Sequence, residues 1–280
     1  MARWFVATRG RALSVASLGI SVGEAFLPLI FVAAMAVIDW RVLWVVAAAI
    51  ALLGVPLLGT LLRQERTPQS VSEAYAATGM FGQHWTRKSV ITHPLFWMLV
   101  PMMLGPSAFN TAFFFHQVHL AELKGWEHVD LVALFPLYTA VSICAMIVSG
   151  WALDRYGAAR LMPGFLLPLV VAFLIFSGAT TTTAAALGLA VFGLSTGAMS
   201  TLPNAFWAEV YGTGHIGAIK SMVAAVMVFG SAIGPGITGY LIDLGIGLEV
   251  QFLWIAGYFV LASLMMAAGI TWARRDLITD

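Results

Sequence analysis

Charged side chains are scarce in this sequence. Asp, Glu, Lys and Arg make up only 10% of the 280 residues, whereas about 25% is usual for soluble domains. Hydrophobic residues make up 60% and form successive runs of roughly 20 residues, which a globular interior does not use. A net charge of +1 provides no bulk attraction to nucleic acid. The composition therefore excludes a soluble domain and indicates a polytopic membrane protein.

The chain also has few of the residues that enzymatic and metal chemistry require. Its one cysteine, Cys144, excludes a disulfide within the chain and a cysteine metal cluster. No G-x-S-x-G, H-E-x-x-H or phosphate-binding glycine loop with lysine occurs. His116, His119 and Glu122 come nearest to a metal site, but three weakly clustered ligands do not make one. We expect no enzyme, no metal and no cofactor, so any transport would use gradients.

Eight apolar runs are long enough to cross a bilayer as helices, at about 1.5 Å per residue. Their continuity favours helices over the alternating strands of a barrel. The runs cover residues 14–37, 42–62, 95–118, 130–152, 161–178, 183–206, 218–242 and 251–272. The sequence therefore predicts an all-α membrane fold in which a polar connection, 63–94, separates two helices from six.

Lysine and arginine are distributed unequally between the two sides of this topology. The side that carries both termini has Arg3, Arg9, Arg11, Arg63, Arg66, Arg87, Lys88, Arg155, Arg160, Lys220, Arg274 and Arg275. The opposite side has only Arg41 and Lys124. By the positive-inside rule, both termini are predicted to be cytoplasmic.

The first and last helix pairs resemble each other. Shifting the sequence by 207 positions aligns identical residues at six positions in the window 10–30. The aligned pairs are Gly10 and Gly217, Ser14 and Ser221, Gly23 and Gly230, Ala25 and Ala232, Pro28 and Pro235, and Ile30 and Ile237. Such an internal repeat is typical of transporters built from two related halves. It makes the first two helices counterparts of the last two.

One loop carries a more specific motif. The sequence from Gly150 through Asp154, Arg155 and Gly157 to Arg160 resembles the G-x-x-x-D-R-x-G-x-R loop of the major facilitator superfamily. The glycine–proline helices of that family resemble two stretches here, which contain Gly19, Gly23 and Pro28, and Gly230, Gly234 and Pro235. Residues 4–13 also resemble the cytoplasmic approach to helix five in bacterial members, in a branch that carries small organic anions.

The resemblance implies a gradient-driven carrier that moves a small solute, with protons as a candidate second partner, by alternating access across a bacterial inner membrane. The eight helices would correspond to the family's helices five to twelve. Residues 1–62 would be a remnant of the N-terminal half, 63–94 the central cytoplasmic loop, and 95–280 the C-terminal six-helix half. The alternative is a truncated, non-transporting fragment, or one part of a split carrier whose missing helices are supplied in trans.

The family's loop motif holds the two halves together on the cytoplasmic side. The resemblance therefore gives Asp154, Arg155, Gly157 and Arg160 a gating role, with Asp154 expected near Gly10 and Arg11. An ordinary solvated loop is the alternative. Small-residue faces let helix backbones approach each other in lipid, so Gly230 and Gly234, and likewise Gly19 and Gly23 in the first run, are predicted packing positions. Pro235 is expected to bend its helix there.

Glu24 is predicted near the bilayer midplane. A carboxylate that faces lipid there costs a few kcal/mol, so Glu24 should be protonated, paired or turned to a cavity. It is the candidate for proton coupling. A neutral acid hydrogen-bonded between helices is the alternative.

The run 95–118 contains the densest polar sequence, and Pro101, Gly105 and Pro106 predict a broken helix beside a cavity. It corresponds to the family's cavity-lining helix seven. Three residues in or near this run, and one in the run 183–206, are candidate solute contacts: Asn110, His116, Gln117 and Asn204. Hydrogen bonds between helices are the alternative for the first three. For Asn204, the proposed place is the inner exit of the path.

Overall fold

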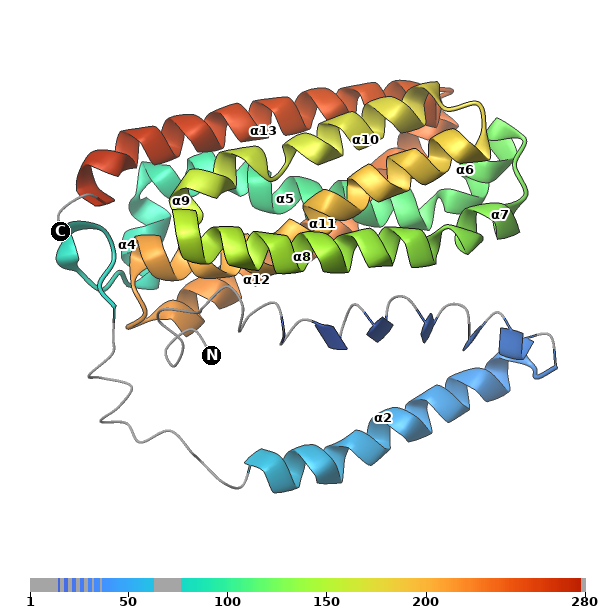
Figure 1. Ribbon diagram of the computed structural model, residues 1–280, viewed down its shortest axis with the longest axis horizontal. Coiled ribbons are helices and arrows are strands. Elements are labelled where there is room, and N and C mark those ends of the chain that lie inside the picture. Colours follow the sequence, from blue (N-terminus) through green and yellow to red (C-terminus); the bar gives the residue numbers. More distant parts are fainter. Residues whose placement is uncertain are drawn as a thin grey trace.

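The structure is a computed structural model. It describes residues 37–62 and 77–277, together with single positions between Val15 and Met35. In these described parts every regular element is a helix (Figure 1). The helices are α2 (Trp40–Leu62), η1 (Met80–Gly82), α4 (Arg87–Thr92), α5 (Pro94–Phe115), α6 (Gln117–Lys124), α7 (His128–Ala133), α8 (Phe135–Tyr156), α9 (Ala158–Leu161), η2 (Met162–Gly164), α10 (Leu167–Gly178), α11 (Thr182–Tyr211), α12 (Ile216–Asp243) and α13 (Leu248–Leu277).

Seven stretches of the described chain are long and apolar enough to cross a membrane. They are Trp40–Thr60, Pro94–Phe115, His128–Tyr156, Ala158–Gly178, Thr182–Tyr211, Ile216–Asp243 and Leu248–Ala273. The predicted all-helical membrane fold is confirmed, and these stretches match seven of the eight predicted runs. The remaining run, 14–37, lies in the incompletely described part of the chain, and the sidedness of the termini stays a prediction.

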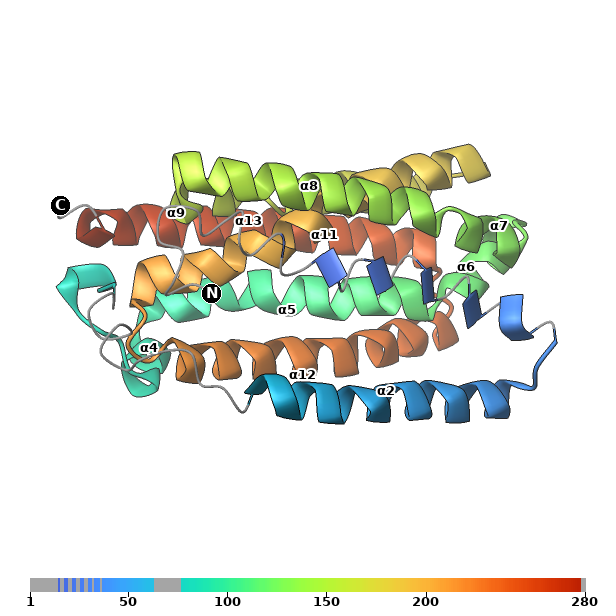
Figure 2. The same cartoon turned by 60° about the horizontal axis from the view of Figure 1, so that its bottom comes forward.

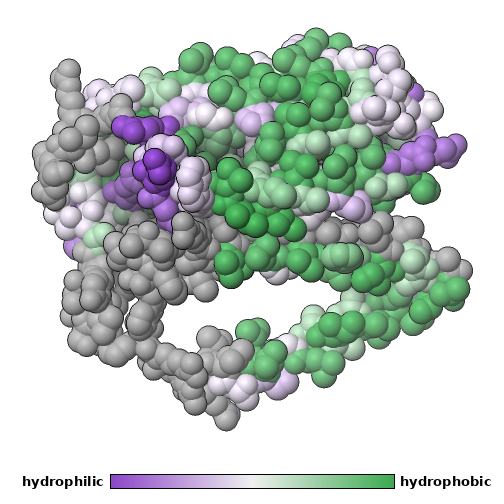
Figure 3. Space-filling view, viewed as in Figure 1, coloured by the Kyte–Doolittle hydropathy of each residue, from purple (hydrophilic) through white to green (hydrophobic). Residues whose placement is uncertain are grey.

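Six long helices, α5, α8, α10, α11, α12 and α13, form one bundle. Helix α11 packs against α8 and α10, α5 packs against α12 and α13, and α10 packs against α13. Figure 2 shows α5 and α12 side by side along their length. In Figure 3 hydrophobic surface covers the middle of the bundle, while hydrophilic surface gathers towards its two ends. This band is the surface that a bilayer solvates.

Aromatic rings from four helices form the centre of the bundle. Phe113 of α5 lies 4.5 Å from Phe176 of α10 and 5.4 Å from Phe192 of α11, centroid to centroid. Phe252 of α13 joins them at 6.1 Å from Phe113. All four side chains are buried. The cluster ties together helices that are distant in sequence, because each ring buries a large apolar area against rings of the other helices.

Glycines bring two helix pairs into backbone contact. A Cβ built on Gly234 would lie 2.2 Å from the Ala108 carbonyl oxygen, and one on Gly230 would lie 2.8 Å from that of Leu104. Gly197 meets α8 in the same way, with 2.1 Å to the Ser142 carbonyl oxygen. Such contacts join α12 to α5 and α11 to α8 without a hydrophobic driving force.

Helix α2 differs from the bundle helices because only 6% of its span is buried.

The predicted packing glycines Gly19 and Gly23 precede α2 in the chain. A Cβ on Gly19 would meet nothing within 4 Å, and one on Gly23 would meet only the Leu27 side chain. Among the described residues these glycines therefore have no helix against them. Their packing role stays a prediction.

The prediction of a broken helix at Pro101, Gly105 and Pro106 is wrong. Helix α5 runs through all three positions. Gly105 instead makes room for the ring of Tyr258, since a Cβ there would lie 2.3 Å from that ring. The Tyr258 hydroxyl donates to the Pro101 carbonyl oxygen at 2.8 Å. The interruption comes later, at His116, whose φ and ψ of −93° and 15° separate α5 from α6.

Part of the polar connection 63–94 is folded against the bundle. The Thr213 backbone N–H donates to the Ala77 carbonyl oxygen at 2.9 Å, and the Trp85 N–H donates to that of Tyr211 at 3.2 Å. The Trp85 and Tyr211 rings lie 5.6 Å apart. Residues 77–93 thus cover the end of α11 where α8 also ends, a role that their polar composition did not indicate.

The opposite end of the bundle is held by one cation. The Lys124 ammonium, whose side chain is 6% exposed, forms an ion pair with Glu249 of α13. It also donates to the Ser177 carbonyl oxygen at 3.1 Å. The Ser177 hydroxyl donates to the Glu249 carbonyl oxygen at 2.8 Å. These bonds join α6, α10 and α13.

Candidate functional site

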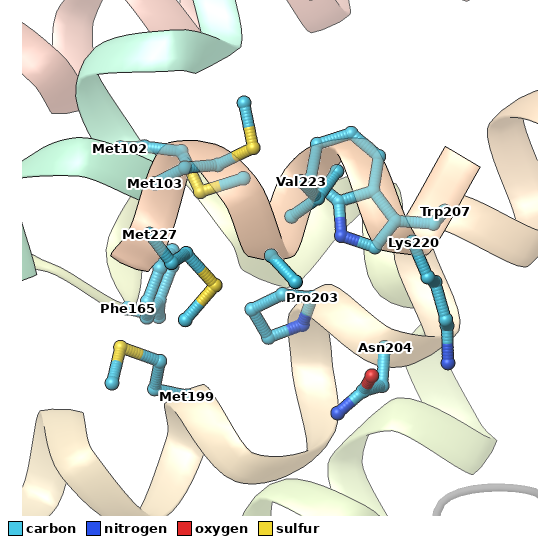
Figure 4. Close-up of a pocket in the computed structure, with 11 residues that line it drawn as sticks. Met102, Met103, Phe165, Met199, Pro203, Asn204, Trp207, Lys220, Val223 and Met227 are labelled. Carbon is cyan, nitrogen blue, oxygen red and sulfur yellow. The ribbon is translucent and has the colours of Figure 1, made fainter. Parts of the chain in front are cut away.

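A pocket of about 290 Å³ lies between α5, α11 and α12 (Figure 4). Its walls come from those helices and from Phe165, which precedes α10. The lining residues are Met102, Met103, Phe165, Met199, Pro203, Asn204, Trp207, Lys220, Val223, Ala224 and Met227. Of the predicted solute contacts, only Asn204 is among them.

The pocket is chemically divided. Four methionines and Phe165 give a polarisable, adaptable apolar wall. Figure 4 shows Asn204, Lys220 and Trp207 at the other end. Lys220 lies in the second turn of α12 and is the cation of the pocket lining. The pocket can therefore receive a molecule with an apolar body and an anionic head.

Helix α11 connects this pocket to the motif loop. Glu209, five residues beyond Asn204, accepts hydrogen bonds from the backbone N–H groups of Ala158 at 2.9 Å and Ala159 at 3.4 Å. Gly157 before them has φ 78°, a conformation that favours glycine. A carboxylate at a helix N-terminus is stabilised by the N–H groups and by the dipole. Glu209 thus clamps the α8–α9 turn to α11.

The charged residues of the motif lie on the surface around this clamp. Asp154, Arg155 and Arg160 are exposed. The Arg155 guanidinium lies over the rings of Trp151 and Tyr156, at 6.0 and 5.8 Å from their centroids. Gly10 and Arg11, the expected neighbours of Asp154, lie outside the described residues. The gating role of the four motif residues therefore stays a prediction.

Replacing Glu209 by Gln should loosen the α8–α9 turn. The neutral amide keeps the shape but has one acceptor oxygen in place of two, so it loses the charge and one of the two hydrogen bonds, at a cost of about 1–2 kcal/mol. Hydrogen–deuterium exchange of the peptide 157–164 should rise by about tenfold. Glu122→Gln, an exposed carboxylate on α6, is the matched control and should leave this peptide unchanged. Equal protection in Glu209→Gln and the parent protein would contradict the clamp.

The other predicted solute contacts lie elsewhere. His116 faces α12, where its Nε2 is 3.0 Å from the Pro235 carbonyl oxygen and its Cε1 would be 3.5 Å from a Cβ on Gly239. Asn110 and Gln117 each bury a side-chain oxygen for which the described residues provide no hydrogen-bond partner. Glu24 lies outside the described residues. Solute contact by Asn110, His116 and Gln117 stays a prediction.

Sequence reasoning missed Glu209 and the methionine wall. Glu209 is an acidic residue near the end of a predicted membrane helix, and this position was a signal that could have marked it. The methionines belong to ordinary apolar runs, so no local pattern distinguishes them. Across the described residues, no group of three His, Cys, Asp or Glu side chains gathers as a metal site would require.

A bundle of helices long and apolar enough to cross a membrane, with a pocket that has a charged end, defines the class of polytopic membrane proteins with a solute-sized pocket. A family model described as Major Facilitator Superfamily matches residues 1–224. The chain belongs to the major facilitator superfamily. This membership points to a transporter rather than an enzyme.

Two mammalian proteins of this kind are similar to the chain. Monocarboxylate transporter 13 of Rattus norvegicus is 28% identical over 268 residues, which cover 94% of this chain and 60% of the relative. Monocarboxylate transporter 13 of Bos taurus is 27% identical with the same coverage. The chain thus spans 60% of the length of these curated relatives.

Proposed function

We propose that this chain takes part in gradient-driven secondary transport of a small organic anion. The main support for this proposal is the pocket between α5, α11 and α12, with Lys220 and Asn204 at one end and methionines at the other. Two relatives whose names describe them as monocarboxylate transporters support an anionic solute. The residues 4–13 are the reason for proposing a bacterial inner membrane, although these two relatives are mammalian.

In this proposal the positive end of the pocket binds the carboxylate of the solute. A carboxylate that leaves water for an apolar pocket loses its hydration, at a cost that a nearby cation and hydrogen-bond donors must offset. Lys220 is proposed to offer that compensation, together with the second N–H of the Asn204 amide, whose other N–H donates to the Ser200 carbonyl oxygen at 3.0 Å. The methionine wall receives the hydrocarbon part of the solute and tolerates variation in its shape.

Alternating access is the proposed mechanism. Rigid-body rocking of one helix bundle against another opens the solute site to each side in turn. Pocket residues and the Glu209 clamp lie on the same helix, α11, so movement of the α8–α9 turn would be transmitted to the pocket wall. Asp154, Arg155, Gly157 and Arg160 are proposed to stabilise the outward-facing state. Asn110 is a proposed solute contact near mid-depth, and His116 and Gln117 are proposed contacts towards the outer end of the path.

Uptake into proteoliposomes tests the function. With an inward proton gradient, the purified chain should accumulate radiolabelled short monocarboxylates saturably and should not accumulate the corresponding neutral amides. Carboxylate binding without uptake would favour the alternative in which transport needs helices from a second polypeptide. If the chain neither binds nor takes up carboxylates, the proposal is overturned.

Glu24 is the proposed proton carrier, because a midplane acid can exchange protons with a cavity. Glu24→Gln should remove the dependence of carboxylate uptake on the proton gradient while counterflow of the solute persists. Unchanged gradient dependence in a folded Glu24→Gln variant would exclude the coupling role. Glu122→Gln on α6 serves as the matched control.

A further inference from the structure

The bundle has a second hollow, on the outside of α8, α10 and α11. Helices α8 and α10 both pack against α11, while no comparable packing joins α8 to α10 within the described bundle. In Figure 1, α11 lies between the other two. The space between them is an apolar groove of about 620 Å³. It differs from the candidate solute pocket, which lies between α5, α11 and α12.

Small side chains create this groove. Ala140, Cys144 and Ala152 line one wall, and Gly164 and Ala198 lie across from them. The lining is apolar apart from the Ser149 hydroxyl and the Cys144 thiol. Larger side chains at the rim, such as Val148 and Leu194, are exposed. In a bilayer, such a hollow is filled by hydrocarbon, since water is excluded from that depth.

The length of the groove matches one leaflet. Its α8 wall runs from Ala140 to Ala152, or about 18 Å at 1.5 Å per residue. One leaflet contributes about 15 Å of hydrocarbon. The groove can therefore hold most of one acyl chain that lies parallel to α8.

The end of the groove at Tyr156 carries two arginines and one acid, Asp154, and thus a net positive charge. Arg155 follows Ala152 by one turn, and Arg160 precedes Leu161, which lines the groove. Both arginines are exposed. Trp151 and Tyr156 beside Arg155 are aromatic residues of the kind that mark a membrane interface. An acyl chain in the groove would thus place its head group near two guanidinium groups.

The geometry points to a binding site for one anionic phospholipid, with an acyl chain in the α8–α10 groove and its phosphate at Arg155 and Arg160. Hydrophobic area alone does not favour a bound chain, because the surrounding bilayer is equally apolar. Preference must come from the head group and from filling the hollow. The site should therefore prefer anionic lipids over zwitterionic ones. This preference is independent of solute binding in the pocket between α5, α11 and α12.

Native mass spectrometry of the purified chain in detergent tests this site. With equal phosphatidylglycerol and phosphatidylcholine, the protein should retain one phosphatidylglycerol with a preference on the order of tenfold. The variant in which both Arg155→Gln and Arg160→Gln are present should lose that preference. The variant with Arg87→Gln and Lys88→Gln, which removes the same charge from α4, should keep it. Equal retention of the two lipids by the parent protein would overturn the proposal.

A second pair of variants tests the groove itself. A Cβ on Gly164 or on Gly178 would meet nothing within 4 Å, but only Gly164 lines the groove. Gly164→Phe should abolish phosphatidylglycerol retention, and Gly178→Phe should preserve it. Equal retention by both variants, or a dimer in place of the lipid-bound monomer, would refute the site.

Chemical labelling of Cys144 offers an independent test of the site, because Cys144 is the one thiol of the chain and lines the groove. Labelling of Cys144 by a lipophilic maleimide in detergent should slow several-fold when phosphatidylglycerol is added. Phosphatidylcholine should slow it less. A labelling rate that neither lipid changes would contradict an acyl chain in the groove.

Discussion

Replacing Lys220 by Met should weaken the binding of a small carboxylate by about 10- to 100-fold, because a charge-assisted hydrogen bond contributes about 1.5–3 kcal/mol. The substitution keeps an unbranched side chain in the pocket wall, so the space for the apolar body of the solute is largely unchanged. The loss should be specific for charge. Binding of the neutral amide of the same acid should change by less than about threefold.

Equilibrium binding to the purified chain measures this effect. Lys88→Met is the matched control, since Lys88 is an exposed cation on α4 outside the solute pocket and its replacement removes the same charge. Lys220→Arg should retain part of the affinity, because the charge remains while the geometry changes. Equal carboxylate affinity in Lys220→Met and the parent protein would remove this pocket as the anion site.

Replacing Gly234 by Ala should destabilise the protein by about 1–3 kcal/mol, the usual cost of overpacking a tight contact. The new methyl group would lie 2.2 Å from the Ala108 carbonyl oxygen and 2.6 Å from its carbonyl carbon. Backbone atoms on α5 have no rotamer with which to move away. Helices α5 and α12 must therefore separate along the contact that Figure 2 shows.

Gly236 on the same helix provides the control. A Cβ there would meet nothing within 4 Å. Gly236→Ala should be neutral or stabilise the protein by up to about 1 kcal/mol, since alanine favours helix more than glycine does. Thermal denaturation in detergent should thus give a lower melting temperature for Gly234→Ala and an unchanged or higher one for Gly236→Ala. A similar decrease in both variants would show that the α5–α12 contact is not responsible.

Much of the membrane architecture could be predicted because it depends on local chemistry. A run such as 218–242 must form a helix in lipid, where each backbone polar group needs a partner within the helix. The structure has α12 at Ile216–Asp243 and α13 at Leu248–Leu277, close to the predicted runs. Proline and glycine were less reliable guides. Pro101, Gly105 and Pro106 suggested a broken helix, but Gly105 serves the contact with Tyr258.

The residues predicted to contact the solute lie in different places in the structure, and solute contact by each of them stays a prediction. Asn204 lines the pocket between α5, α11 and α12, whereas His116 lies against Pro235 and Gly239 in the contact between α5 and α12. Depth along a helix can be counted from the sequence. The direction in which a side chain points within a bundle depends on how each helix is rotated, and many residues distant in sequence set that rotation together.

The sequence by itself determined that this is a helical membrane protein, which runs are long enough to cross the bilayer, and which family its motif loop resembles. These properties follow from hydrophobic length and from short motifs. Only the tertiary structure decided that Glu209 clamps the α8–α9 turn, that Lys220 and four methionines share a pocket, and that α8 and α10 leave a groove over α11. Each of these joins residues from separate helices. Their proximity is set by backbone contacts such as those of Gly234 with Ala108 and of Gly197 with Ser142. The sequence marked Gly234 as a packing position but could not name its partner on another helix.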